Sequence, residues 1–183
     1  MMALVDRALV LNPNFARGWQ MSGILRMWAG QPDIAIEHVD AALRLSPRAP
    51  VGNSLSVIGT AHLISRRFNE AVPKLLLAMQ QNPTNPQTHR VLASCYAHMG
   101  RLDDAREVVQ RLRAITPVVI PDVLPYASYR RNPEHRELFF SGLRAWRSAR
   151  RSEPDPPPRR DPGRRCGRVF AADGSGWRPT RSA

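Results

Sequence analysis

Four prolines divide most of the chain into segments of nearly equal length. Pro13, Pro47, Pro83 and Pro117 follow one another at intervals of 34, 36 and 34 residues. Each proline ends a similar short segment, which has an alanine or a leucine five residues before the proline. A fixed period of this length is typical of arrays whose units pack only against their neighbours. The sequence therefore predicts a repeat protein.

Each unit has the pattern of two amphipathic helices separated by a short break. Small residues recur at matching offsets: Gly23, Gly59 and Ala93 in the first half of a unit, and Ala35, Ala71 and Ala105 in the second half. Small side chains allow two antiparallel helices to approach closely, so each unit reads as a helical hairpin. A proline that ends each second helix tilts the next one. We predict an all-α fold of stacked hairpins, without a closed bundle.

The pattern resembles the tetratricopeptide repeat (TPR), which has Trp, Leu-Gly, Tyr, Ala, Phe, Ala and Pro at fixed places in 34 residues. The matching positions are Trp19, Gly23, Ala35, Ala42 and Pro47 in one unit, Gly59, Ala71, Ala78 and Pro83 in the next, and Leu92, Tyr96, Gly100, Ala105 and Pro117 in the third. The resemblance covers roughly residues 1–117 and implies a TPR-type α-solenoid. Val39, Leu75 and Val109 stand where the family often has an aromatic residue, and Leu112 replaces an alanine. We expect these departures to loosen the packing without changing the fold.

The register predicts the organisation of the whole chain. It gives an orphan second helix of a truncated repeat at 1–13, TPR hairpins at 14–47, 48–83 and 84–117, a proline-rich connector at 118–131, a capping helix at 132–149, and a disordered Arg/Pro/Gly-rich tail at 150–183. Asn132-Pro133-Glu134 reads as a helix cap, a first helical residue and a first-turn acid. The tail has no Leu or Ile, so it cannot offset its ordering entropy by apolar burial. Because residue 1 already lies in a second helix, we expect a truncated or frameshifted fragment of a longer protein, or a late start codon.

The charge of the chain is strongly positive but unevenly distributed. The net charge is +12, of which +5 falls within 150–183, and Lys74 is the only lysine among 27 basic residues. Nucleic acid is therefore expected to bind only nonspecifically, through the basic tail. The sequence contains no run of about 18 apolar residues, the length that a membrane-spanning helix needs. Its first residues also lack the apolar core of a secretory signal. We expect a cytoplasmic protein with two unpaired thiols, Cys95 and Cys166.

No catalytic, cofactor or metal-binding constellation stands out. The five histidines form no HExxH motif and share no ligand spacing with a cysteine pair. There is no phosphate-binding glycine loop, and no strand-borne carboxylate pair of the kind that cyclase chemistry requires. Asp33, Glu37 and Asp40 are interpreted as a solvated helix face. We predict no enzyme activity, no cofactor and no metal site.

The TPR pattern implies a concave groove lined by the first helices of successive units. The groove positions are Arg17, Gln20, Ile24, Met27, Asn53, Ser56, Thr60, Leu63, Gln87, Arg90, Ser94 and His98. One interpretation is a groove for an extended or helical peptide, with apolar pockets at Ile24, Met27 and Leu63 and hydrogen-bond donors at Gln20, Asn53 and Arg90. The other is an unselected surface inside a larger protein. The lysine-asparagine clamp of chaperone-binding TPRs is absent, because Gln20, Ile24, Val57, Gln87 and Val91 occupy its places.

Three stretches carry a narrower resemblance. Residues 15–50, 97–117 and 131–144 are similar to the C-terminal TPR region of bacterial proteins that have a class III adenylate or guanylate cyclase domain, or a winged-helix DNA-binding domain, upstream. The resemblance implies a noncatalytic scaffold of a bacterial signalling protein, with a protein or peptide partner or an intramolecular contact to the upstream domain. The alternative is a basic, nucleic-acid-associated regulatory segment of a winged-helix transcriptional regulator.

Overall fold

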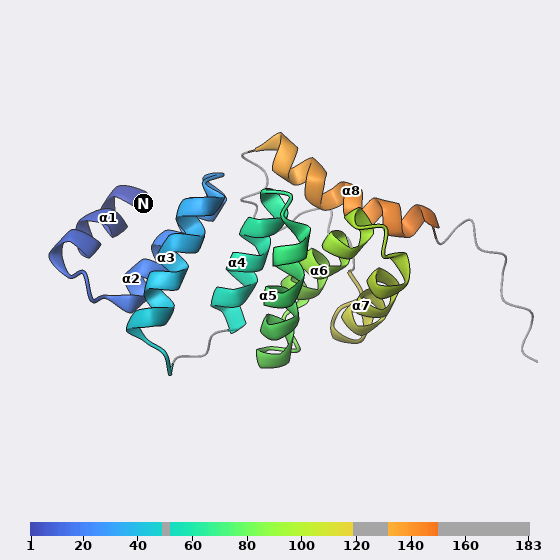
Figure 1. Cartoon of the computed structure of the whole chain (residues 1–183), viewed down its shortest axis with the longest axis horizontal. Helices are drawn as coiled ribbons and strands as arrows, with labels where there is room; N and C mark the ends of the chain where they lie inside the picture. Colours follow the sequence, from blue (N-terminus) through green and yellow to red (C-terminus); the bar gives the residue numbers. More distant parts are fainter. Residues whose placement is uncertain (49–51, 119–131, 150–183) are drawn as a thin grey trace, which may run out of the picture. The chain divides into compact units, whose positions relative to one another are not determined.

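Eight helices account for most of the residues that the computed structural model describes, which are 1–48, 52–118 and 132–149. They are α1 (Met2–Leu11), α2 (Ala16–Trp28), α3 (Pro32–Leu45), α4 (Gly52–Ile64), α5 (Phe68–Gln81), α6 (Pro86–His98), α7 (Leu102–Ile115) and α8 (Pro133–Ala149). No strand occurs in this part of the chain. The predicted all-α array of hairpins is confirmed (Figure 1). The predicted disordered tail, and the predicted connector apart from Val118, lie outside the described residues.

Helices α2–α3, α4–α5 and α6–α7 form three hairpins with similar turns. Gly30 and Gly100 end the first and third turns with φ angles of +80° and +74°, which glycine adopts without the steric cost that a Cβ brings. Arg66 takes the same place in the second hairpin with a φ angle of 57°. The second turn therefore keeps the left-handed backbone conformation although it has an arginine in place of the glycine.

The helices of a hairpin cross where the sequence has small residues. A Cβ atom on Gly23 would lie 2.5 Å from Val39 Cγ2 and 2.9 Å from the carbonyl oxygen of Ala35. In the second hairpin, a Cβ atom on Gly59 would lie 2.5 Å from Leu75 Cγ. The recurring small residues are thus required by the close approach of the two helices.

Helix α4 lies at the centre of the array. It contacts α2, α3, α5, α6 and α8, and all residues from Ser54 to Ile64 except Val57 are buried. Its apolar residues therefore follow no single face, unlike those of α3, α5 and α7. The main core extends from here through α5, α6 and α7 to α8, where it includes Phe139 and Leu143.

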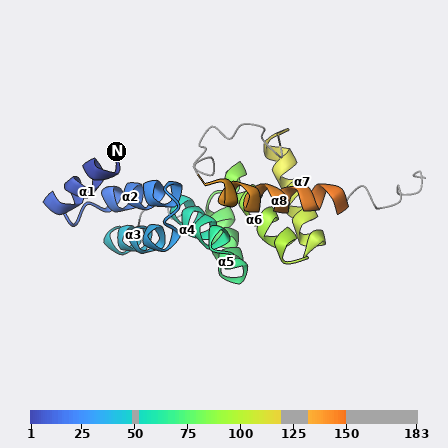
Figure 2. The ribbon, with the colours of Figure 1, turned by 90° about the horizontal axis from the view of Figure 1, so that it is seen from above.

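Helix α8 begins at the predicted cap. The Asn132 side chain accepts hydrogen bonds from the backbone N–H groups of Glu134 and His135, with N···O distances of 2.9 and 3.4 Å. A helix that only capped the stack would pack mainly on α7. Instead, α8 packs chiefly on α6 and also contacts α4 and α7. Figures 1 and 2 both show it lying across α6.

Candidate functional site

The predicted groove residues lie on α2, α4 and α6, the first helices of the three hairpins. Because α4 contacts both α2 and α6, the three helices form one continuous face. Polar side chains connect them: Gln20 Nε2 donates to Ser54 Oγ at 3.0 Å, and Thr88 Oγ1 donates to Ser56 Oγ at 3.0 Å. The structure thus brings the predicted residues onto neighbouring helices, but it does not leave all of them accessible.

The part of this face that α6 contributes is occupied by α8. Ser94 Oγ donates to the carbonyl oxygen of Phe139 at 3.1 Å, and His98 Nε2 donates to that of Leu138 at 2.7 Å. Gly142 lies directly over Ser94, where a Cβ atom would overlap Ser94 Oγ and would lie 2.8 Å from the Ser94 carbonyl oxygen. Two of the predicted ligand-binding side chains, Ser94 and His98, therefore bind α8.

Several other predicted groove residues are buried inside the protein. Met27 and Leu63 belong to the same core cluster as Phe139, so the apolar pockets expected at these two positions are filled by the chain itself. Ser56 and Thr60 are buried on α4, and Thr60 Oγ1 donates to the Ser56 carbonyl oxygen at 2.7 Å. These positions were predicted from the repeat register, which places a side chain on a face without showing what covers that face.

Arg90, another predicted groove residue, also makes a contact within the protein. Its Nη2 atom donates to the carbonyl oxygen of Val118 at 2.7 Å, and only 8% of the residue is exposed. Burial lowers the pKa of its guanidinium group from the usual value. Arg90 therefore ties the end of the third hairpin to α6.

An open cleft remains at the other end of the face, between α2, α3 and α4. It has a volume of about 300 Å³ and is lined by Ala16, Arg17, Gln20, Ala42, Leu43, Ser46, Asn53 and Ser54. Three of these, Arg17, Gln20 and Asn53, belong to the predicted groove. Arg17 and Asn53 are exposed, and Gln20 is half-buried. This is the part of the predicted groove that a ligand could reach.

Hydrogen bonds orient the polar side chains of the cleft. Arg17 Nη1 donates to Gln20 Oε1 at 2.6 Å, and this leaves the Gln20 amide nitrogen to donate to Ser54. Arg17 is the one ionised side chain among the described residues that line the cleft, and Ala42 and Leu43 supply apolar surface. A guanidinium group beside amides and hydroxyls suits an extended segment that carries carbonyl or carboxylate oxygens.

Five cleft residues were missed by the sequence analysis: Ala16, Ala42, Leu43, Ser46 and Ser54. The TPR register assigns the groove to first helices alone, but the last turn of the second helix α3 also lines this cleft. One sequence signal could have indicated that this cleft differs from the regular groove. The interval between Pro47 and Pro83 is 36 residues, whereas the other two intervals between the closing prolines are 34 residues, and the longer interval contains the connection beside the cleft.

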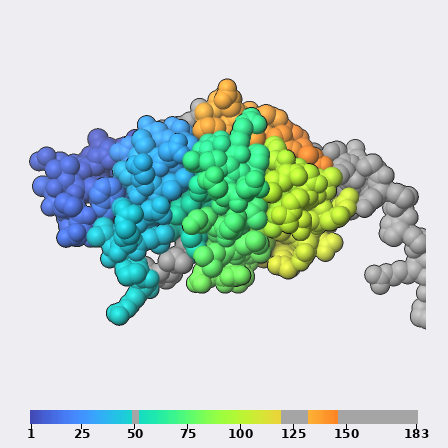
Figure 3. Space-filling model, in the orientation of Figure 1, coloured from blue at the N-terminus to red at the C-terminus, as the bar shows by residue number. Residues whose placement is uncertain are grey.

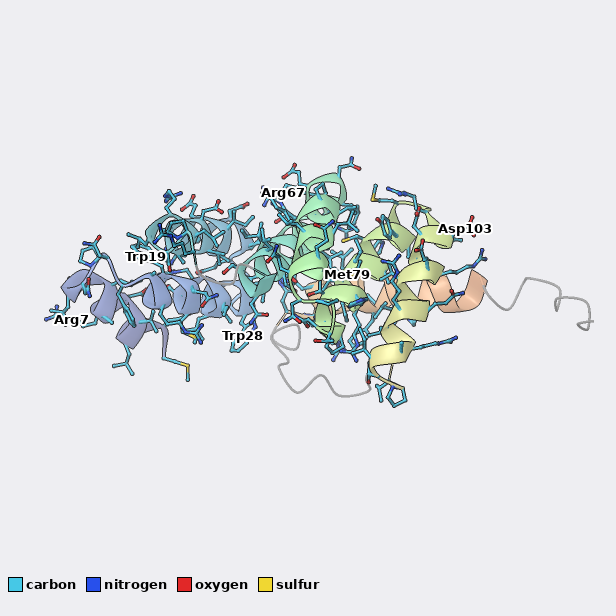
Figure 4. All side chains as sticks on the ribbon, turned by 90° about the horizontal axis from the view of Figure 1, so that it is seen from below. Arg7, Trp19, Trp28, Arg67, Met79 and Asp103 are labelled. Atoms are coloured by element: carbon cyan, nitrogen blue, oxygen red, sulfur yellow. The ribbon has the colours of Figure 1, made fainter. Side chains whose placement is uncertain are left out.

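Trp19 and Tyr96, which match the repeat pattern, and Trp28 all pack against the protein. Trp19 Nε1 donates to the Pro13 carbonyl oxygen at 2.7 Å, and its ring meets the edge of His38. Trp28, at the other end of α2 (Figure 4), packs at the margin of the core. The Arg101 guanidinium carbon lies 4.6 Å from the centroid of the Tyr96 ring. These contacts give each ring a structural role.

Other reactive groups are also engaged in structure. Asp33 pairs with Arg67 at 2.6 Å, and burial raises the pKa of the Cys95 thiol to about 12, which disfavours the reactive thiolate. In residues 1–48, 52–118 and 132–149, no three histidine, cysteine or carboxylate side chains gather as a metal site. Within the same ranges, no helix has the length and apolar character needed to cross a bilayer.

Comparisons with known proteins agree with this fold. Residues 62–123 match the family model of the tetratricopeptide repeat. A crystal structure of MamA is 20% identical, with a TM-score of 0.59 over 82% of this chain and 89% of MamA. YrrB, a TPR protein with an unusual peptide-binding site, is 21% identical, with a TM-score of 0.55 over 83% of this chain and 77% of YrrB. No curated protein matches the sequence. The chain therefore has a TPR-like solenoid fold.

Proposed function

We propose that this protein is a noncatalytic scaffold that binds an extended peptide segment of a partner protein in the cleft between α2, α3 and α4. The observation that supports it is the division of the face formed by α2, α4 and α6: α8 fills the part over Ser94 and His98, whereas the cleft around Arg17, Gln20 and Asn53 stays open. The sequence left open whether this face is a peptide-binding groove or an unselected surface inside a larger protein. We favour the peptide-binding groove for the part of the face where the polar side chains are accessible.

The geometry of the cleft indicates how a peptide would bind. Arg17 and Asn53 can donate to carbonyl or carboxylate oxygens of the segment, while Ala42 and Leu43 can contact a small apolar side chain. Hydrogen bonds that involve a charged group contribute about 1.5–3 kcal/mol. The loss of Arg17 should therefore weaken binding about tenfold or more.

A peptide selection on the full chain would test this function. Random peptides displayed on phage are selected for binding, and the affinities of the selected peptides are measured by fluorescence anisotropy. Arg17→Ala and Asn53→Ala should each weaken binding. Lys74→Ala, which removes an exposed basic side chain from α5, should leave it unchanged. The proposal fails if no peptide is selected, or if the selected peptides bind all three variants like the unaltered protein.

The parent protein is a separate part of the proposal. The resemblance of residues 15–50, 97–117 and 131–144 to the C-terminal region of cyclase proteins supports a cytoplasmic module of a bacterial signalling protein, in which the partner can be an upstream domain of the same polypeptide. Reading the coding sequence before residue 1 tests this. A cyclase domain there would support the proposal, and a winged-helix domain would favour the transcriptional regulator.

The net charge of +12 is the observation that favours the nucleic-acid alternative. Binding that depends on charge alone weakens steeply as salt is raised. If the basic tail is responsible, DNA binding should be lost from a chain that ends at Arg144. Salt-resistant binding by that shortened chain would instead assign nucleic-acid recognition to the helices.

A further inference from the structure

The most exposed large apolar side chains among the described residues lie on helix α1 or directly before it. Met1, Leu4 and Leu11 are 85%, 76% and 72% exposed, and Val10 is exposed as well. Among the described helices, α1 contacts α2 alone, and Leu9 is its one buried residue. Figure 3 shows α1 at the edge of the helices, away from the third hairpin. The exposed large apolar residues of α3 and α5, which are Ile34, Leu45, Leu76 and Leu77, are exposed to a smaller extent, by 37–43%.

Met1, Leu4 and Leu11 form a narrow stripe together with the half-buried Ala8, and Val10 lies outside this stripe. Met1, Leu4, Ala8 and Leu11 follow one another at intervals of three, four and three residues, which is the spacing of the apolar seam in a coiled coil. Ala8 is small and half-buried, so it leaves space for a large side chain from outside. We call these four residues the α1 stripe.

The other hairpins show what covers the equivalent position. Counted back from the closing proline, Met1 corresponds to Ala35, Ala71 and Ala105. All three alanines are fully buried, each in a second helix that packs on the first helix of its own hairpin. At the position equivalent to Met1, each complete hairpin therefore packs its second helix on its own first helix, and α1 has no such first helix among the described residues. Leu4 and Leu11 correspond to Lys74 and Gln81 in the second hairpin, which are exposed, so this equivalence applies to Met1 alone.

We infer that the α1 stripe binds the α1 stripe of a second copy of this chain, with the two helices antiparallel. Antiparallel pairing places Leu4 opposite Ala8 and Met1 opposite Leu11 of the other copy, so that each large side chain of the central pair meets a small one. A twofold axis repeats every contact, as an interface between identical patches requires. The self-complementary order of large and small residues is the reason to assign the second copy as the occupant.

The size and charge of the interface limit the strength of the dimer. One ten-residue helix covers much less than the roughly 800 Å² per partner of a standard interface, so the dimer should dissociate on dilution. Arg7, labelled in Figure 4, is exposed beside Leu4 and Leu11. Two Arg7 side chains approach one another at the rim of the antiparallel pair, and salt screens their repulsion. Added salt should therefore strengthen the dimer.

Sedimentation velocity of the full chain over a series of concentrations tests this inference. The unaltered protein should change from monomer to dimer as its concentration rises. Leu4→Lys should remain monomeric at every concentration, because it places a charge in the stripe. The matched control Leu77→Lys, at an exposed leucine of α5, should dimerise like the unaltered protein. Circular dichroism checks that both variants keep their helices.

Mixing two variants tests the antiparallel order. Leu4→Lys and Ala8→Glu should each be monomeric alone, and a mixture should form a heterodimer in which the introduced lysine faces the introduced glutamate. The inference is overturned if the unaltered protein stays monomeric, if Leu4→Lys dimerises normally, or if the mixture remains monomeric. None of these outcomes depends on the peptide cleft.

Discussion

Gly59 and Leu75 illustrate how single residues set the distance between the two helices of a hairpin. The three atoms nearest to a Cβ atom on Gly59 all belong to the Leu75 side chain, which is fully buried. Alanine ordinarily stabilises a helix relative to glycine by about 1 kcal/mol. Here that gain is opposed by overlap with a side chain that has no free space to move into.

Gly59→Ala should therefore destabilise the protein, by up to about 2 kcal/mol after the helical gain is subtracted from an overpacking cost of about 1–3 kcal/mol. Leu75→Ala removes the overlapping atoms, so in that background Gly59→Ala should be neutral or stabilising. Urea unfolding of the four proteins of this double-mutant cycle measures the change of sign. An equal cost in both backgrounds would show that Leu75 is not the obstacle.

Among the helices, α8 differs most from its expected role. The cap at Asn132 and the apolar residues that follow it predict a helix, and the helix is present. Its position depends on Gly142, which allows the α8 backbone to approach Ser94, and on hydrogen bonds from Ser94 and His98 to α8 carbonyl oxygens. These contacts place α8 over the groove face of α6, where it limits the surface that a ligand can reach.

Gly142→Ala should displace α8, because the Ser94 carbonyl oxygen belongs to the α6 backbone and cannot move aside. An overpacking cost of about 1–3 kcal/mol, less the gain of about 1 kcal/mol that alanine has over glycine in a helix, corresponds to a rise of up to about thirtyfold in the exchange rate of α8 amide hydrogens. Hydrogen exchange followed by mass spectrometry measures this rate, with α2 as the internal reference. Arg136→Ala, at an exposed position of α8, is the control. Unchanged exchange in Gly142→Ala would mean that α8 does not depend on this close approach.

Across the molecule, partial burial lowers the pKa values of three histidines. Burial is the main cause that lowers the pKa values of His38, His62 and His135, which lie on α3, α4 and α8. The positive charges of Arg26 and Arg67 lower the pKa values of His38 and His62 further. The three groups lie in different parts of the fold, so their protonation affects the stability of the whole array.

Stability should fall as the pH is lowered through about 6.5, the pKa of histidine in an unfolded chain. Below that pH the unfolded state binds more protons than the folded state, and the difference persists until the pH falls below the lowered pKa values of the folded protein. Urea unfolding midpoints between neutral and mildly acidic pH measure the effect. His62→Gln should reduce the slope, and the exposed substitution Asn69→Gln should not. If His62→Gln left the dependence of stability on pH unchanged, His62 would not contribute to it.

The hairpins could be predicted from the sequence because their signals are local. Closing prolines, small residues at the crossings and glycines at the turns act within one repeat, and a repeat packs mainly on its neighbours. Arg66 stands where the other two turns have glycine, and the turn still has a positive φ angle there. The accessible part of the groove could not be predicted in this way.

Which groove residues remain accessible depends on contacts between distant parts of the chain. Ser94 and Phe139 are 45 residues apart, a separation that the repeat period of the sequence does not indicate. A hairpin follows from the order of large and small residues along one helix. Whether Ser94 is covered and whether the cleft beside Arg17 stays open depends on how the surfaces of separate helices fit together. That fit exists only once the helices have packed.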